Sequence, residues 1–114
     1  MFEVRRDGDD ELCGFVAADG AGWRAATVFG VTLGQHEDRG EAEQQVIAEG
    51  LASLAEHWML LDGETGEEEI VLIQQSSPTG VTLALGYYSI PGTPSLTITR
   101  AELDAGRWHL RRNA

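Results

Sequence analysis

The chain has 114 residues, nineteen acidic residues against eight basic ones, a net charge of −11 and a single cysteine. This length predicts one domain with a core large enough to fold unaided, and one cysteine excludes an internal disulfide. The negative charge argues against a surface that binds nucleic acid or anionic membranes directly. No apolar run reaches the ~20 residues of a membrane helix, and the first residues do not resemble a signal peptide, so we expect a cytoplasmic protein.

Charge is unevenly distributed along the chain. Residues 7–69 hold sixteen acidic residues but only two arginines, whereas residues 70–99 contain no Asp, Glu, Lys or Arg. Such a long uncharged run in an acidic protein must be largely covered, by its own domain or by a partner. The pattern predicts a shielded β-layer in the second half, with negative groups at its margins.

The first third of the chain reads as β-structure. Residues 2–6 and 11–18 are expected to form two antiparallel strands that are joined by a turn at 7–10. Residues 23–33 alternate in hydropathy, which predicts one long strand with Trp23 towards the core and a bend at Gly30.

A helix is predicted to follow. Asp38 and Glu41 have the spacing of a capping box, which marks the start of the helix. The helix should end between residues 56 and 61, and residues 58–61 are either its last turn or the start of a strand. The apolar residues that indicate the helix recur at helical spacing: Val46, Ile47, Leu51, Leu54 and Trp58. Gly50 weakens this helix, but its small size allows a close approach to a sheet.

The second half is predicted to contain several strands. Residues 59–61 should pair with residues 70–73 in a hairpin, and four consecutive apolar residues at 70–73 indicate a central strand that is covered on both faces. Further strands are expected at 81–88 and 95–99. Thr99 and Glu102 have capping-box spacing for a short helix that Gly106 can end, followed by an edge strand at 108–110 and a frayed end.

Short turns between strands favour antiparallel pairing. We therefore predict an α+β fold: a predominantly antiparallel β-sheet with one long amphipathic helix packed on one face and a short C-terminal helix, in a single domain of residues 1–114.

Motifs for chemistry are weak. Asp7, Asp9 and Glu11 begin like a calcium loop, but the pattern fails at its later positions, which favours a solvated turn. The three histidines lack metal-ligand spacing, and Cys13 reads as a buried, inert thiol. We predict no catalytic residue, no metal site and no cofactor.

Six residues are candidates for binding. Tyr87 and Tyr88 should face opposite sides of a strand, so that one of them reaches an interface or a pocket. His36 is flanked by carboxylates, which makes it the best acid–base group. Glu67, Glu68 and Glu69 belong to an acidic cluster at a hairpin tip that suits a basic partner.

These features favour a small acidic, non-enzymatic protein-interaction domain with an accessory, regulatory, inhibitor-like or immunity-like role. We expect a basic protein partner and a homodimer that forms through the uncharged strands. The alternative is a small-molecule-binding protein or minor enzyme with a pocket between helix and sheet, using His36, Tyr88 and Cys13. A pocket of roughly several hundred Å3 that held both an aromatic and a titratable group would place this alternative above the first hypothesis, whereas a His36 far from any cavity would dispose of it. A third hypothesis, mimicry of nucleic acid, rests on acidity alone.

Overall fold

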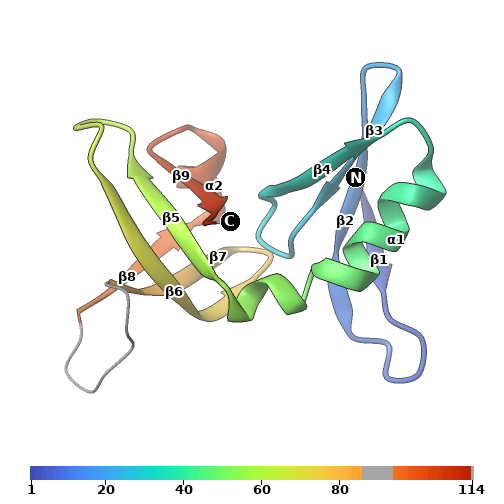
Figure 1. Cartoon of the computed structure of the whole chain (residues 1–114), viewed down its shortest axis with the longest axis horizontal. Helices are drawn as coiled ribbons and strands as arrows, with labels where there is room; N and C mark the ends of the chain where they lie inside the picture. The colour runs from blue at the N-terminus through green and yellow to red at the C-terminus, as the bar shows by residue number, and fades with distance from the viewer. Residues whose placement is uncertain (86–93, 114) are drawn as a thin grey trace. The chain divides into compact units, whose positions relative to one another are not determined.

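The computed structural model describes residues 1–85 and 94–113, and it divides the chain into two compact units, residues 1–53 and 54–114 (Figure 1). The first unit contains β1 (Phe2–Arg5), β2 (Leu12–Asp19), β3 (Gly22–Ala26), β4 (Thr32–His36) and α1 (Arg39–Glu49), followed by the start of a short 3-10 helix (Ala52–Ala55). The second contains β5 (His57–Asp62), β6 (Glu68–Ser77), β7 (Gly80–Leu85), β8 (Ser95–Thr99), α2 (Arg100–Asp104) and β9 (Trp108–Arg112).

The predicted α+β class with mainly antiparallel strands is confirmed, because every strand pair in the described residues is antiparallel. The strands form two sheets, where one sheet was expected. The helix on the first sheet is shorter than predicted. The prediction of a single domain stays a prediction.

The first unit is a four-stranded sheet in the order β1-β2-β3-β4, with α1 packed against it. Small and β-branched residues fill the space between helix and sheet: Val4, Cys13, Val16, Ala25, Ala42 and Val46. Trp23 lies at the margin of this core and is half-buried. The guanidinium of Arg39 stacks over the rings of Trp23 and Phe2, and so covers them from the helix side.

The predicted long strand at 23–33 is wrong, because the chain turns between β3 and β4. The Thr27 hydroxyl accepts a hydrogen bond from the Val31 N–H (3.1 Å), and Gly30 has a left-handed φ of 87°. Residues 25–29 are buried consecutively, which a regular strand with one covered face does not allow. The alternating hydropathy continues through the turn and conceals it.

The predicted long helix is matched only in part: α1 ends at Glu49, and a short 3-10 helix at Ala52–Ala55 follows it. Ile47, expected in the apolar stripe, is 48% exposed, and Trp58 lies in β5, where it is fully buried. Asp38 is the N-cap residue, but its side chain makes no capping hydrogen bond. The predicted role of Gly50 is confirmed: a Cβ there would collide with the Cys13 carbonyl oxygen on β2, so the helix meets the sheet at a glycine.

The second unit is a five-stranded sheet in the order β8-β7-β6-β5-β9. The predicted hairpin is confirmed, since Met59 pairs with Ile70 and His57 pairs with Leu72. β6 is central as expected, but only Val71 among residues 70–73 is fully buried. One face of the sheet carries the large buried side chains: Trp58, Leu60, Val71, Val81, Leu83, Ile98 and Leu110.

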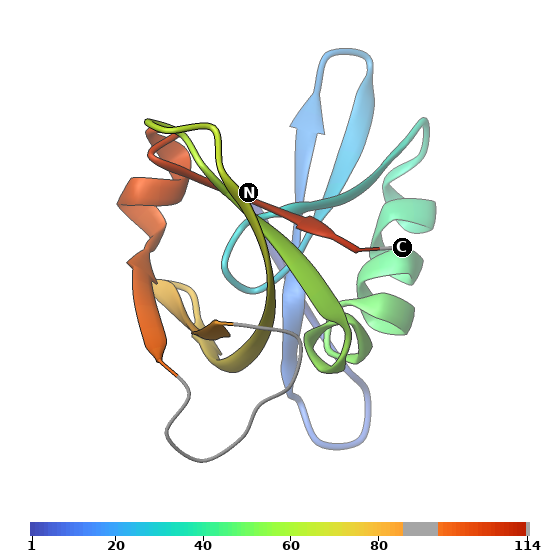
Figure 2. The same cartoon turned by 60° about the vertical axis from the view of Figure 1, so that its left-hand side comes forward.

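The short helix α2 connects β8 to β9 (Figure 2), and the predicted capping box is present at its start. The Thr99 hydroxyl accepts a hydrogen bond from the Glu102 N–H, and the Glu102 carboxylate accepts one from the Thr99 N–H, each at 3.1 Å. Gly106 has a left-handed φ of 80° at the end of α2, as expected. The predicted fraying at 111–114 is wrong for Arg111 and Arg112, which pair with β5.

Candidate functional site

A cavity of about 430 Å3 opens on the second unit. Its lining comes from all five strands of the sheet and combines apolar with acidic side chains: Leu60, Asp62, Glu67, Glu68, Glu69, Leu85, Leu96 and Trp108. This volume falls within the range of roughly 300–1,000 Å3 that is usual for ligand pockets.

Strand pairing brings most of these residues to one face of the sheet; the exceptions are Glu67, which precedes β6, and Glu68, which alternates with Glu69 on that strand. Leu60 lies across from Glu69 on β6, and Asp62 lies across from Trp108 on β9. Residues two apart on a strand share a face, so Leu60 and Asp62 point to the same face of the sheet. Their cross-strand partners, Glu69 and Trp108, point to that face as well. Trp58 precedes them on that face and is fully buried. The cavity is therefore the open end of the core face, with an apolar floor.

Asp62 is held as an anion at the edge of this cavity. Its Oδ1 accepts hydrogen bonds from the N–H groups of Glu64 (2.8 Å) and Thr65 (3.2 Å) and from Nη1 of Arg107 (2.8 Å). These contacts, with the Glu64 N–H as the largest cause, lower the pKa of Asp62. The same contacts fix the β5–β6 turn, so the carboxylate is rigidly placed.

Trp108 is fixed by its neighbours in a similar way. The Arg107 guanidinium lies 4.1 Å from the centre of the Trp108 ring system. The Glu102 carboxylate has its pKa lowered, mainly by the hydrogen bond from the Thr99 N–H and further by a hydrogen bond from the Trp108 side chain. An aromatic ring that is held by both a cation and a carboxylate presents a preformed surface to a ligand.

The cavity carries an excess of negative charge. Glu68 forms an ion pair with Arg111 at 3.5 Å, and Asp62 is paired with Arg107. Glu67 and Glu69 are exposed and have no ion-pair partner among the described residues. Two uncompensated carboxylates above an apolar and aromatic floor suit a ligand that is positively charged at one end and apolar along its stem.

The predicted binding residues fall into three groups. Glu67, Glu68 and Glu69 come together at the cavity. His36 lies in the first unit and does not line this cavity. Tyr87 and Tyr88 lie outside the described residues, so their predicted role stays a prediction.

His36 connects β4 to α1. Its Nε2 is 2.7 Å from Oε1 of Gln45, and the Gln45 amide nitrogen also donates to the Leu33 carbonyl oxygen at 3.3 Å. Glu37 and Asp38 are exposed, and in the described structure neither forms a hydrogen bond or ion pair with the His36 ring. A half-buried histidine with a neutral amide partner is suited to holding the helix on the sheet.

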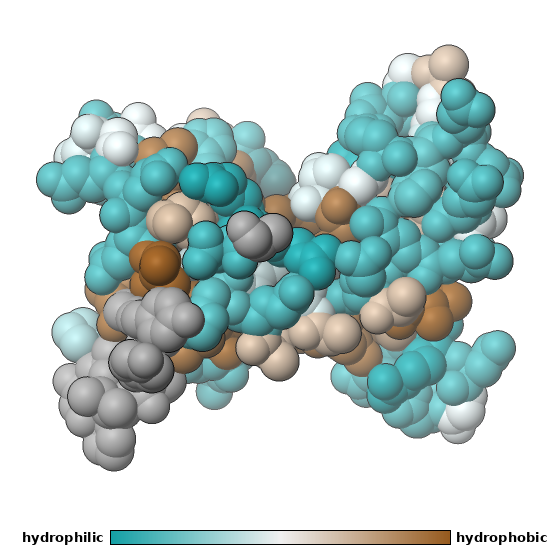
Figure 3. Space-filling view, in the orientation of Figure 1, coloured by the Kyte–Doolittle hydropathy of each residue, from teal (hydrophilic) through white to brown (hydrophobic). Residues whose placement is uncertain are grey.

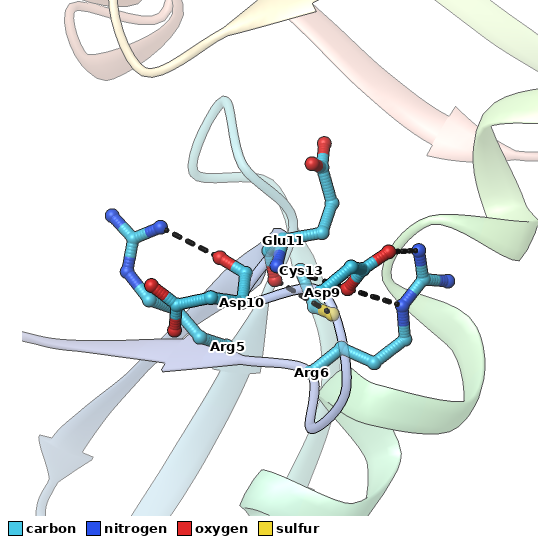
Figure 4. Close-up of polar contacts among 6 residues, drawn as sticks. All are labelled: Arg5, Arg6, Asp9, Asp10, Glu11 and Cys13. Atoms are coloured by element: carbon cyan, nitrogen blue, oxygen red, sulfur yellow. Dashed lines mark hydrogen bonds and ion pairs between the residues drawn. The ribbon is translucent and has the colours of Figure 1, made fainter.

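Cys13 and the neighbouring β1–β2 turn form a compact polar cluster (Figure 4). Cys13 is buried, its Sγ contacts the Glu11 carbonyl oxygen at 3.5 Å, and burial raises the pKa of the thiol. A thiol that is held protonated is a poor nucleophile. Asp9 receives hydrogen bonds from the Arg6 guanidinium (2.6 and 3.2 Å) and from the Glu11 N–H (3.1 Å). The aspartate therefore binds an internal cation and a backbone amide.

In residues 1–85 and 94–113, no group of three or more His, Cys, Asp or Glu side chains has the arrangement of a metal site. Over the same residues, no helix combines the length and hydrophobicity that crossing a bilayer requires.

Trp108, Leu60, Leu85 and Leu96 are the lining residues that the sequence analysis did not identify as part of a site. Each belongs to a different strand, and they meet only through the register of the sheet. The one available signal was an aromatic residue beside an arginine at 107–108, and that pattern is common in ordinary edge strands.

Comparison of the chain with protein-family models, with curated proteins and with solved structures finds no match.

Proposed function

We propose that this protein is a non-enzymatic interaction domain, and that its second unit binds a positively charged segment of a partner protein. The observation that carries the proposal is the convergence of Glu67 and Glu69 with Trp108 at one cavity. A lysine or arginine side chain has an apolar stem and a cationic head, so it can cover the apolar floor while its charge meets the carboxylates.

The apolar floor distinguishes this site from a merely charged surface. Exposed ion pairs alone contribute little, typically up to about 1 kcal/mol each, whereas an aromatic face adds about 0.5–1 kcal/mol for a cation that stacks on it. A partner with several basic residues gains binding free energy both from ion pairs with the carboxylates and from stacking on the aromatic face. The protein's net charge of −11 raises the association rate for such a partner.

The test is binding of a short Arg/Lys-rich peptide to the intact chain, measured by calorimetry. Replacing Glu67 and Glu69 by Gln should weaken binding about 2- to 30-fold, since each lost contact is worth roughly 0.2–1 kcal/mol. The matched control replaces Glu37 and Glu41 in the first unit, which removes the same charge from exposed positions. Equal weakening by both double variants would mean that net charge alone attracts the peptide, and the cavity would not be the site.

A small organic cation is the second candidate ligand, and the size of the cavity favours it. Its aromatic and titratable groups meet the condition set for a small-molecule site, although the cavity lies on the sheet and not between helix and sheet. L-arginine amide is the probe that separates the two candidates. The interaction-domain proposal predicts that the peptide binds much more tightly than this single cation. Equal affinities would favour the small-molecule function.

A further inference from the structure

The two edges of the second sheet differ in how they are protected. β9 carries two arginines, Arg111 and Arg112, whereas β8 contains only Ser, Thr, Leu and Ile. Charged residues on an edge strand normally prevent pairing with another chain. β8 lacks this protection, and in the described structure no strand lies on its outer side.

Both edges of the first sheet are protected, one by charged side chains and the other by the helix. β1 carries Glu3 and Arg5, which form an ion pair at 2.8 Å. β4 is held against α1 by Gln45, which contacts both His36 and the Leu33 carbonyl oxygen. Among the four sheet edges, β8 is therefore the one with neither charge nor a helix side chain bonded to its backbone.

The backbone of β8 has groups available for pairing. Leu85 donates to the Pro94 carbonyl and Arg100 donates to the Thr79 carbonyl, at the two ends of the β7–β8 ladder. Bonded pairs alternate in an antiparallel ladder, so the bonded residues of β8 between these ends are Leu96 and Ile98. The N–H and C=O groups of Ser95 and Thr97 consequently point away from β7, and both residues are exposed.

We propose that β8 pairs with β8 of a second copy of this chain, in antiparallel orientation about a two-fold axis at Thr97. The chain carries a net charge of −11, so two copies repel each other over most of their surface, and the uncharged edge removes that repulsion locally. A basic partner would instead be drawn to the acidic cavity. An antiparallel strand pair is self-complementary, which is what a two-fold dimer requires.

The capping box of α2 sets the length of this pairing. With Thr97 on the axis, the two Thr97 residues exchange N–H···O bonds. Ser95 of each copy then lies opposite Thr99 of the other, whose carbonyl accepts the first hydrogen bond of α2 as its N-cap residue. The Thr99 N–H is already donated to Glu102 at 3.1 Å, so the ladder ends there. The dimer would contain one continuous sheet, formed by the second unit of each copy.

Sedimentation of the intact chain over a concentration series tests the proposal, with Thr97→Lys as the first variant. The expected wild type is a dimer, and two lysines facing each other across the axis should raise its dissociation constant by up to about fivefold. The control is Thr82→Lys, which places the same charge on the adjacent inner strand, where Thr82 contacts Thr97 at 3.1 Å. A monomeric wild type, or a dimer that both lysine variants leave equally intact, would overturn the proposal.

A second pair of variants tests the backbone directly. Thr97→Pro and Thr97→Val both lose the hydroxyl contact with Thr82, but only proline removes the outward N–H. The proline variant should raise the dissociation constant about 5- to 150-fold, for two lost hydrogen bonds, while the valine variant remains dimeric. Circular dichroism checks that both variants fold. If the proline variant does not fold, the comparison of Thr97→Lys with Thr82→Lys tests the proposal instead. Equal dimerisation of the proline and valine variants would overturn the proposal.

Discussion

The Arg107 guanidinium stacks on the Trp108 ring with Cζ 4.1 Å from the ring centre, while its Nη1 donates to Asp62 at 2.8 Å. Both partners line the cavity of the second unit. The chain thus already binds one of its own cations with Trp108 and a carboxylate of the cavity, the kinds of group that we propose for a partner's cation. This internal pair shows that an aromatic ring and a carboxylate at this spacing accommodate an arginine.

Replacing Arg107 by Gln should strengthen binding of a basic peptide. The change removes the positive charge that pairs with Asp62 and Glu64, which leaves more negative charge at the cavity. We expect the affinity to rise about two- to fivefold, as measured by calorimetry at low salt. The control is Arg39→Gln in the first unit, which changes the net charge equally. An unchanged or weaker affinity for the Arg107 variant alone would contradict this account of the cavity.

The Asp9 carboxyl should titrate far below its ordinary range. The hydrogen bond from Arg6 is the largest cause that lowers its pKa from 3.8 to about 2. Because the folded pKa lies below the unfolded one, the contact stabilises the first unit above pH 3.8, and the stabilisation is lost as pH falls towards 2. Carboxyl NMR titration measures this pKa.

Arg6→Gln should return the pKa of Asp9 towards 3.8, with a residual lowering from the Glu11 N–H. Arg5→Gln is the matched control, since Arg5 contacts Glu3 and the Asp10 carbonyl and not the Asp9 carboxylate. If both variants shift the Asp9 titration by the same amount, general charge is responsible and not the hydrogen bond (Figure 4).

Gly50→Ala should destabilise the protein by about 1–3 kcal/mol, because the new methyl group must displace the Cys13 carbonyl on β2 or the helix backbone at Val46. Chemical denaturation measures the change. Gly40→Ala is the control in the same helix, where a Cβ meets only the flexible Asp38 side chain. That variant should be neutral or slightly stabilising, since alanine favours helix. Equal effects at the two glycines would contradict the close approach of α1 to the sheet.

Thr99→Ala should cost about 1 kcal/mol of stability, because the hydroxyl that caps α2 is lost. Thermal unfolding is the measurement. Ser95→Ala, at the exposed start of the same strand, should change the melting temperature little. A melting temperature that is insensitive to Thr99 would mean that the capping box does not hold α2.

Local patterns with a mechanism of their own were predictable from the sequence. The Thr99–Glu102 capping box and the hairpin of β5 with β6 were found because each depends on residues close in the chain. The turn at Thr27 was missed because an alternating pattern runs through it, and Trp58 was included in the helix stripe because it lies four residues after Leu54.

The cavity was only partly predictable. Glu67, Glu68 and Glu69 stand out as an acidic cluster, so they were identified. Trp108 reaches Asp62 only through the pairing of β9 with β5, which lie more than forty residues apart in the sequence. Register between distant strands follows from the packing of the whole sheet, and a single sequence does not reveal it.

On the face drawn in Figure 3, hydrophilic residues cover most of the surface and hydrophobic ones reach it in smaller patches. Trp108 is half-buried and lines the cavity together with carboxylates. It also provides a spectroscopic probe, because the three tryptophans lie in different places: Trp23 at the margin of the first core, Trp58 within the second, and Trp108 at the cavity.

The most direct test of the proposed function is the indole N–H signal of Trp108 in NMR spectra of the intact chain, during titration with an Arg/Lys-rich peptide. Our account predicts that the Trp108 signal shifts in a saturable way together with the amides of Glu67 and Glu69, while the Trp23 signal stays in place. A Trp108 signal that remains unchanged while the peptide binds would contradict it.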